Sequence, residues 1–275
     1  MNKGSIHCCI HFPGFSLQVA TLLHPELVGK AFAWIHLTAG TVTSEQMSPA
    51  ARRLRIPNQI TLSELQKRWP QVGIIHAVPA AQQSLIERLL AITEAMTPQF
   101  RFERSSLHLD LTGIRPPPGS DWGTWATIFA ASIERQCGLR TRRIAIAPTQ
   151  ASAELLAVAM RQAKPLVCPA DMERAWLAKV PLRLVPALSP RIQARFQLYS
   201  LRTLGDLQRL DQRHVLKHFG VEGESLHARS LGFEPSPSKP SQLDMFGELK
   251  GEAGCASEPS SGTGPRQMPQ AQRAS

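Results

Sequence analysis

The sequence predicts an α+β fold, in which a ferredoxin-like sheet carries its helices on one face and is followed by an all-α segment and a disordered tail. Three observations predict it. Strand-like and helix-like segments alternate from about residue 70 to about residue 165, and short helical segments rich in Arg and Leu continue to about residue 232. Pro, Gly and Ser then make up 18 of the 42 residues from 234 to 275, a composition that cannot bury enough apolar surface to order itself.

The strands are expected from short apolar runs and from side chains that alternate between apolar and polar. Four apolar runs qualify, at residues 5–12, 31–37, 73–78 and 143–147. Residues 100–111 instead alternate Phe or Leu with polar residues. This period of two predicts a pair of strands joined at Ser105–Ser106.

Helices are expected where apolar residues recur at a spacing of three or four. Leu85, Leu89 and Ile92 recur in this way, and Thr61 with Glu64 forms a capping-box pattern. The four expected helices of this part of the chain span residues 61–69, 81–96, 122–136 and 149–162.

The length and charge of the chain limit its partners. Its 275 residues, 43% of them hydrophobic, can bury a sizeable core in two or three modules. The formal charge is +10, and residues 234–275 hold four basic and five acidic residues, so the whole excess precedes them. Such a charge favours phosphate-bearing partners over a membrane, because no run of eighteen apolar residues is present. The alternative is that the positive charge has no specific partner and only keeps the protein in solution.

The cysteines indicate a reducing compartment. They are odd in number and scattered, without paired metal-ligand spacing, at Cys8, Cys9, Cys137, Cys168 and Cys255. We therefore expect reduced thiols in a cytoplasmic protein, with no bound metal and no cofactor. His7, His11 and Pro13 interrupt the first apolar stretch, so no signal peptide is expected.

Four stretches, in order within residues 5–235, resemble the Y-family (translesion) DNA polymerases. Residues 58–70 are similar to the fingers segment after that family's Tyr-Glu-Ala-Arg motif, and residues 107–113 to the palm strand that ends in Leu-Asp-Leu-Thr-Gly. Residues 144–148 are similar to the palm's Gly-Ile-Ala-Pro-Asn-Lys region, and residues 182–220 to the thumb. The resemblance implies a palm of residues 1–13 and 70–165, fingers of 14–69, a helix-hairpin-helix thumb of 166–232 and the tail of 233–275.

The metal-binding carboxylates of that family are missing at the matching positions. The family has one Asp at the end of the first strand, where residues 8–11 read Cys-Cys-Ile-His, and an Asp-Glu pair that falls here on Ser105 and Ser106. Thiols and hydroxyls are poor ligands for Mg²⁺. Asp110 matches a structural Asp of the family, and His11 fits a core residue better than a ligand for a softer metal. We therefore expect no catalytic residues, with Cys9, Ser105 and Ser106 as degenerate positions.

The nucleotide-binding residues of the family have changed as well. Its fingers Tyr and Arg fall on Pro49 and Arg52, its palm-helix Lys falls on Glu154, and its bulky residue against ribose falls near Gly14. A carboxylate about 5 Å from a phosphate oxygen costs on the order of 3 kcal/mol at an effective dielectric near 20. The resemblance with these departures predicts no polymerase activity; an active low-fidelity polymerase is the open alternative.

This combination resembles the ImuB-type proteins, catalytically inactive Y-family relatives that act as scaffolds in a bacterial mutagenic repair complex. It implies a non-catalytic accessory protein of translesion synthesis in the DNA-damage (SOS) response. The implied partners are a RecA-like accessory protein and an error-prone C-family DNA polymerase. Such proteins usually continue further beyond the thumb, so the resemblance also implies a shortened form. The second alternative is a shortened DNA-binding protein that competes with other proteins for the replication sliding clamp.

A pentapeptide in the tail resembles the peptide with which bacterial polymerases bind the sliding clamp. It reads Gln242, Leu243, Asp244, Met245 and Phe246. In this interpretation, a few apolar anchors enter pockets of the clamp and the Gln242 amide makes a hydrogen bond at the rim. The alternative is a chance apolar cluster.

Basic residues are frequent in the expected thumb helices, at Arg191, Arg195, Arg202, Arg209, Arg213 and Lys217. A helix-hairpin-helix holds phosphates through backbone N–H groups and does not read sequence. The family's Gly-Ile-Gly hairpin reads Ala187, Leu188, Ser189 here, and losing both glycines restricts the turn. We expect weak, salt-sensitive DNA binding without sequence preference. The alternative is a basic face exposed to water.

Overall fold

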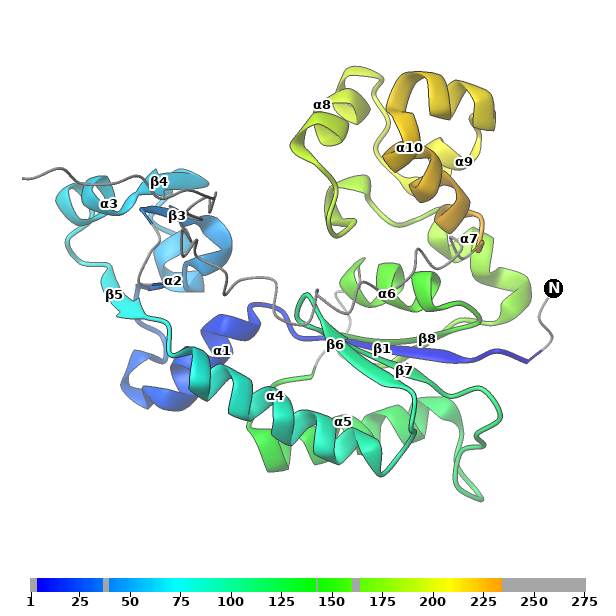
Figure 1. Ribbon diagram of the computed structural model, residues 1–275, viewed down its shortest axis with the longest axis horizontal. Helices are drawn as coiled ribbons and strands as arrows, with labels where there is room; N and C mark the ends of the chain where they lie inside the picture. Colours follow the sequence, from blue (N-terminus) through cyan, green and yellow to red (C-terminus); the bar gives the residue numbers. More distant parts are fainter. Residues whose placement is uncertain (1–3, 37–39, 142, 160–163, 234–275) are drawn as a thin grey trace, which may run out of the picture. The chain divides into compact units, whose positions relative to one another are not determined.

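The computed structural model describes residues 4–36, 40–141, 143–159 and 164–233. Its largest sheet has five strands in the order β6-β7-β1-β8-β9, antiparallel except between β8 and β9 (Figure 1). The strands are β1 (His7–His11), β6 (Phe100–Glu103), β7 (Ser106–Asp110), β8 (Arg143–Ala147) and β9 (Leu166–Val167). The α+β class and the expected hairpin of residues 100–111 are confirmed.

Helices cover both faces of this sheet, so the prediction of helices on one face is wrong (Figure 1). One face packs against α1 (Phe15–Leu23), α4 (Pro79–Glu94) and α5 (Trp122–Cys137), and we call it the α4–α5 face. The other packs against α6 (Gln150–Ala159), and we call it the α6 face. The reason lies in small side chains: Cys9, Ala145 and Ala147 leave room for α6 to approach the strands closely.

The α4–α5 face is apolar throughout. Leu107 and Ile10 are fully buried there, and Phe129 of α5 packs against the same cluster. α1 also belongs to this core, through Phe15 and its neighbours, although the predicted fingers range of 14–69 includes α1. Continuous burial of such side chains, at about 25 cal/mol per Å² of apolar surface, is the main favourable term for this part of the fold.

Two small sheets form a separate core. β2 (Phe32–Ile35) pairs in parallel with β5 (Gly73–His76), and β3 (Thr41–Thr43) pairs antiparallel with β4 (Gln59–Thr61). With them go α2 (Pro49–Arg52) and α3 (Leu62–Arg68), and Met47 and Leu65 are buried at the middle. The capping box of α3 is half formed: the Thr61 hydroxyl accepts from Glu64 N–H, but the Glu64 carboxylate pairs with Arg68 instead.

Residues 170–233 are helical. The α-helices are α7 (Glu173–Leu177), α8 (Pro190–Leu198), α9 (Leu204–Gln208) and α10 (Gln212–Ser230), and two short 3₁₀ helices lie at Ala170–Met172 and Leu182–Leu184. Two further 3₁₀ helices, Pro25–Leu27 and Ser44–Gln46, lie earlier in the chain. Their core is continuous with that of α6, through residues such as Leu156, Leu177 and Phe196. Gly220 has non-helical φ/ψ (69°, −166°) and divides α10. In the described ranges, no helix combines the length and apolarity that crossing a membrane requires.

Candidate active site on the α6 face of the sheet

Polar and ionisable side chains gather on the α6 face. Residues directly opposite each other in neighbouring strands share a face. His11 lies opposite Ser106 and Arg143, and Cys9 lies opposite His108. By the same pairing, the face carries the side chains of His7, Cys9, His11, Arg101, Glu103, Ser106, His108, Asp110 and Arg143.

The hairpin between β6 and β7 places Ser105 and Ser106 differently from the expectation. Glu103 pairs with Ser106, so the two turn residues are Arg104 and Ser105, with φ of 49° and 63°. Positive φ at both central positions is the pattern of a type I′ turn, which suits the twist of a hairpin. The turn therefore begins one residue earlier than predicted, and Ser106 is the first residue of β7.

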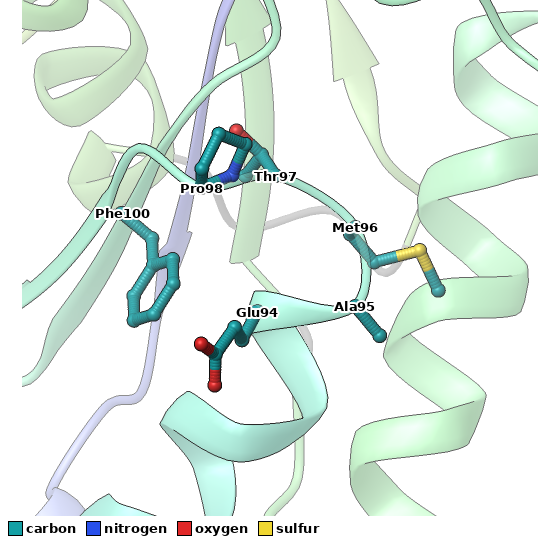
Figure 2. Close-up of a pocket in the computed structure, with 6 residues that line it drawn as sticks. All are labelled: Glu94, Ala95, Met96, Thr97, Pro98 and Phe100. Carbon is teal, nitrogen blue, oxygen red and sulfur yellow. The ribbon is translucent and has the colours of Figure 1, made fainter.

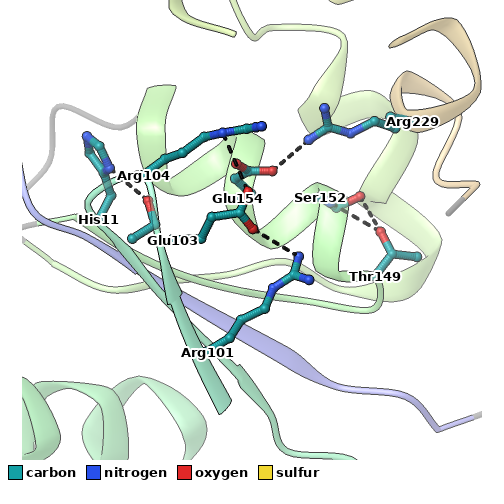
Figure 3. Close-up of polar contacts among 9 residues, drawn as sticks. His11, Arg101, Glu103, Arg104, Thr149, Ser152, Glu154 and Arg229 are labelled. Carbon is teal, nitrogen blue, oxygen red and sulfur yellow. Dashed lines mark hydrogen bonds and ion pairs between the residues drawn. The ribbon is translucent and has the colours of Figure 1, made fainter. Parts of the chain in front are cut away.

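His11 is the residue of β1 that contacts Ser106. Its Nδ1 lies 3.0 Å from Ser106 Oγ, in a hydrogen bond drawn in Figure 3. Burial, and then the positive charge of Arg143, lowers the pKa of His11 to about 4. The imidazole is thus neutral at pH 7, and the place where the family resemblance puts acidic groups holds a neutral ring and a hydroxyl.

Cys9 lies deeper in the same face. Its side chain is fully buried beneath α6, and burial, followed by the charge of Glu154, raises the pKa of its thiol well above the ordinary value. A thiol that stays protonated is a poor metal ligand and a poor nucleophile. Cys9 is therefore a packing residue at the contact between β1 and α6.

Two carboxylates on or near this face, those of Glu103 and Glu154, are already paired with arginines (Figure 3), and the third, Asp110, lies 4.0 Å from His7. Glu154 of α6 accepts a hydrogen bond of 2.7 Å from Arg229 of α10, and both side chains are at most one fifth exposed. Glu103 lies 3.7 Å from Arg101 and 3.5 Å from Arg104. Across the described residues, no group of three His, Cys, Asp or Glu side chains is arranged to hold a metal ion. The residues present do not fit the pair of divalent ions that a polymerase uses.

The fingers positions make local contacts. Pro49 is the first residue of α2, which Ser48 caps by accepting from Ala51 N–H. Arg52 donates from Nε to the Met47 carbonyl at 2.9 Å. The cations predicted for the thumb lie on α8 and α10 or directly beside α9. Arg191, Arg202, Arg209, Arg213 and Lys217 are exposed, while Arg195 is half-buried and donates to the His218 carbonyl at 2.6 Å.

Two pockets lie in the described part of the chain, and the predicted clamp peptide lies outside it. Gln242, Leu243, Asp244, Met245 and Phe246 lie outside the described residues. A pocket of about 260 Å³ on the α6 face is lined by His7, Arg101, His108 and Asp110 among others. A second pocket, of about 370 Å³, lies where α4 leads into β6, and none of its lining residues belongs to the α6 face (Figure 2).

Sequence reasoning missed several residues of the α6 face. Arg101, Glu103 and His108 were available from the same period-two alternation that predicted the hairpin, because they face the side opposite Phe102 and Leu107. Arg143 follows from the pairing of β8 with β1. Arg229 is 75 residues from Glu154, and no local pattern in the sequence connects them.

No protein-family model matches the chain. Among curated proteins, it is 25% identical over 197 residues to DNA polymerase IV of Yersinia enterocolitica, covering 70% of this chain and 54% of that protein. It is 23% identical over 255 residues to DNA polymerase IV 1 of Halalkalibacterium halodurans, covering 90% and 59%. The chain thus spans little more than half the length of the curated relatives it matches.

Solved structures agree on the fold. The crystal structure of DinB from Sulfolobus solfataricus aligns with a TM-score of 0.69 at 14% identity, covering 84% of this chain and 68% of that one. A ternary complex of Dbh aligns with a TM-score of 0.68 at 15% identity and the same coverage. The chain therefore has the fold of the DinB-type DNA polymerases, and its sequence relates it to DNA polymerase IV of the Y family.

Proposed function

We propose that this chain binds primer–template DNA with a polymerase fold and acts in lesion bypass without transferring nucleotides itself. The observation that carries the proposal is the pair of residues at the end of β1 and the start of β7, where His11 Nδ1 meets Ser106 Oγ at 3.0 Å. Mg²⁺ is held by hard, anionic oxygens, and two such ions neutralise the triphosphate during phosphoryl transfer. A neutral imidazole and a hydroxyl supply neither property.

The Glu154–Arg229 pair supports the same proposal. The resemblance places a triphosphate-binding Lys at Glu154, and Glu154 instead accepts a hydrogen bond from the thumb residue Arg229. A half-buried carboxylate with a fixed cationic partner repels a phosphate and is itself unavailable to a metal. Nucleotide affinity is therefore expected to be low.

An active low-fidelity polymerase is the second candidate, and the comparisons favour it, because the relatives are DNA polymerase IV proteins. Primer extension on a primer–template with all four dNTPs, in Mg²⁺ and separately in Mn²⁺, decides between the two. We expect no templated incorporation by the purified chain. Templated incorporation, abolished by replacing His11 and Ser106 with Ala, would establish the polymerase and end the non-catalytic proposal.

The clamp tether and the further partners belong to this proposal as well. Gln242 to Phe246 would attach the chain to the sliding clamp, and a RecA-like accessory protein and an error-prone C-family polymerase would join it there, as in ImuB-type proteins. A titration of clamp with wild type and with Leu243→Ala/Phe246→Ala tests the tether. We expect at least tenfold weaker binding of the double variant, because apolar anchors dominate such peptides; equal affinity would contradict it. The cytoplasmic location stays a prediction.

A further inference from the structure

The first hairpin of the thumb, just before α8, is already occupied by a carboxylate. Ser189 begins α8 as its N-cap, and its Oγ accepts from Ile192 N–H at 3.3 Å. Its own backbone N–H donates to Glu222 Oε1 at 2.6 Å, and its hydroxyl donates to Glu222 Oε2 at 2.7 Å. One carboxylate from α10, 33 residues away, thus takes two donors of the hairpin.

The turn before α8 holds one residue in the left-handed conformation without using a glycine. Ala187, in place of the first glycine, has a φ of 60°, in the left-handed region where a residue with a Cβ is strained. The loss of glycine therefore leaves the turn in place. Backbone N–H groups at a helix start, together with the helix dipole, favour an anion at this point.

The two helices that meet at this hairpin carry exposed cations. Arg191 lies in the first turn of α8, and Arg213 and Lys217 lie in the part of α10 before Gly220. Gly220 divides α10 two residues before Glu222 and so allows the second half of the helix to present Glu222 to the hairpin. Glu222 is an acidic group that accepts from two donors of Ser189, and both donors would also suit a phosphate.

We propose that Glu222 is an internal competitor for phosphate, which holds the thumb hairpin closed until a backbone phosphate of DNA displaces it. The inference rests on the proposed DNA binding, and it adds that Glu222 limits how tightly the hairpin binds DNA. A carboxylate and a phosphodiester are both anionic acceptors, and the two short hydrogen bonds of Glu222 use the donors that a phosphate needs. DNA therefore gains a hairpin contact only by breaking both.

The test compares Glu222→Gln with Glu224→Gln. Glu224 is the matched control, because it lies two residues further along α10, is also half-buried and accepts a hydrogen bond from Gln212 at 2.8 Å. Both variants remove one negative charge from the same helix, and only Glu222→Gln weakens the contact at Ser189, because its amide keeps a single accepting oxygen. Fluorescence anisotropy with a short primer–template duplex measures affinity over a range of salt concentrations.

We expect Glu222→Gln to bind DNA about tenfold more tightly than wild type, and Glu224→Gln to stay within about twofold, because an added phosphate contact is worth roughly one charge-assisted hydrogen bond. The slope of log K against log salt should steepen by about 0.9 for one further phosphate. Equal gains in the two variants would reduce the effect to net charge and overturn the inference. Binding by wild type without any gain in Glu222→Gln would overturn it while leaving the proposed function intact.

A second measurement covers the case in which Glu222→Gln does not fold. In wild type, addition of the duplex should shift the backbone amide signal of Ser189 in an ¹H–¹⁵N correlation spectrum, since the N–H exchanges one acceptor for another. An unshifted Ser189 signal at saturating DNA would refute displacement of Glu222. Absence of DNA binding in every variant would refute both the inference and the proposed function.

Discussion

The two faces of the five-stranded sheet differ in what their residues do. The α4–α5 face is an apolar core in which Ile10, Leu107 and Leu109 are buried. The α6 face alternates with it residue by residue and carries His11, Ser106 and His108. The fold depends on the first face, while the chemistry of a polymerase would depend on the second. A chain can therefore keep the architecture of a polymerase while the ionic groups of its site change.

The largest expected effect on stability comes from comparing substitutions at two adjacent residues of β7 whose side chains point to opposite faces of the sheet. Leu107→Ala should destabilise the fold by roughly 3 kcal/mol, because it empties a fully buried site. Ser106→Ala, its neighbour, should cost about 1 kcal/mol or less, the value of one hydrogen bond. Urea denaturation followed by circular dichroism measures both. Equal losses would mean that the α6 face supports the fold as strongly as the apolar face does.

Acid should weaken the fold through the α6 face. Burial, followed by the charge of Arg101, lowers the pKa of His108 to about 4, below the value near 6.5 of an unfolded histidine. As the pH falls, His108 takes up its proton in the unfolded chain before it does so in the folded protein. The free energy of unfolding therefore decreases between about pH 6.5 and about pH 4. The loss should be on the order of 2 kcal/mol for this residue. His108→Gln should flatten that part of a plot of unfolding free energy against pH.

An exposed histidine is the control for this prediction. His214→Gln removes a histidine whose side chain is 72% exposed, so an equal flattening in both variants would contradict a role for the burial of His108. If His108→Gln kept the wild-type slope, the acid sensitivity would have to come from other groups, with His11 as the first to test.

A smaller effect than those of Leu107 and His108 should come from the ion pair that joins α6 to α10. Replacing Arg229 with Met leaves Glu154 half-buried without its partner and should cost about 1 kcal/mol, since one fifth of each side chain is exposed to water. Arg229→Met/Glu154→Gln should recover most of that loss in a double-mutant cycle of unfolding free energies. Additive losses in the two single variants would show that the 2.7 Å contact carries no coupling.

The sequence was informative about the strands and much less so about partners across the fold. Period-two alternation predicted the hairpin of residues 100–111, and the resemblance correctly indicated a Y-family polymerase relationship. The continuous apolar run of β8 would instead have predicted helices on both faces, because Ile144 and Ala145 are buried on opposite sides of the sheet. The contacts of Glu154 with Arg229 and of Glu222 with Ser189 join segments that are distant in the sequence. They could not be predicted, because local periodicity assigns a residue to a face but does not identify its partner on that face.

The tight turn at Arg104 and Ser105 decides which face each residue of β7 occupies. With only two residues between the paired strands, the turn fixes the register, and a slip of β7 by one residue would exchange its two faces. Leu107 and Leu109 would then face α6, and Ser106 and His108 would enter the apolar core. A substitution at the tip keeps the length of the hairpin and therefore the register on which both faces of the sheet depend.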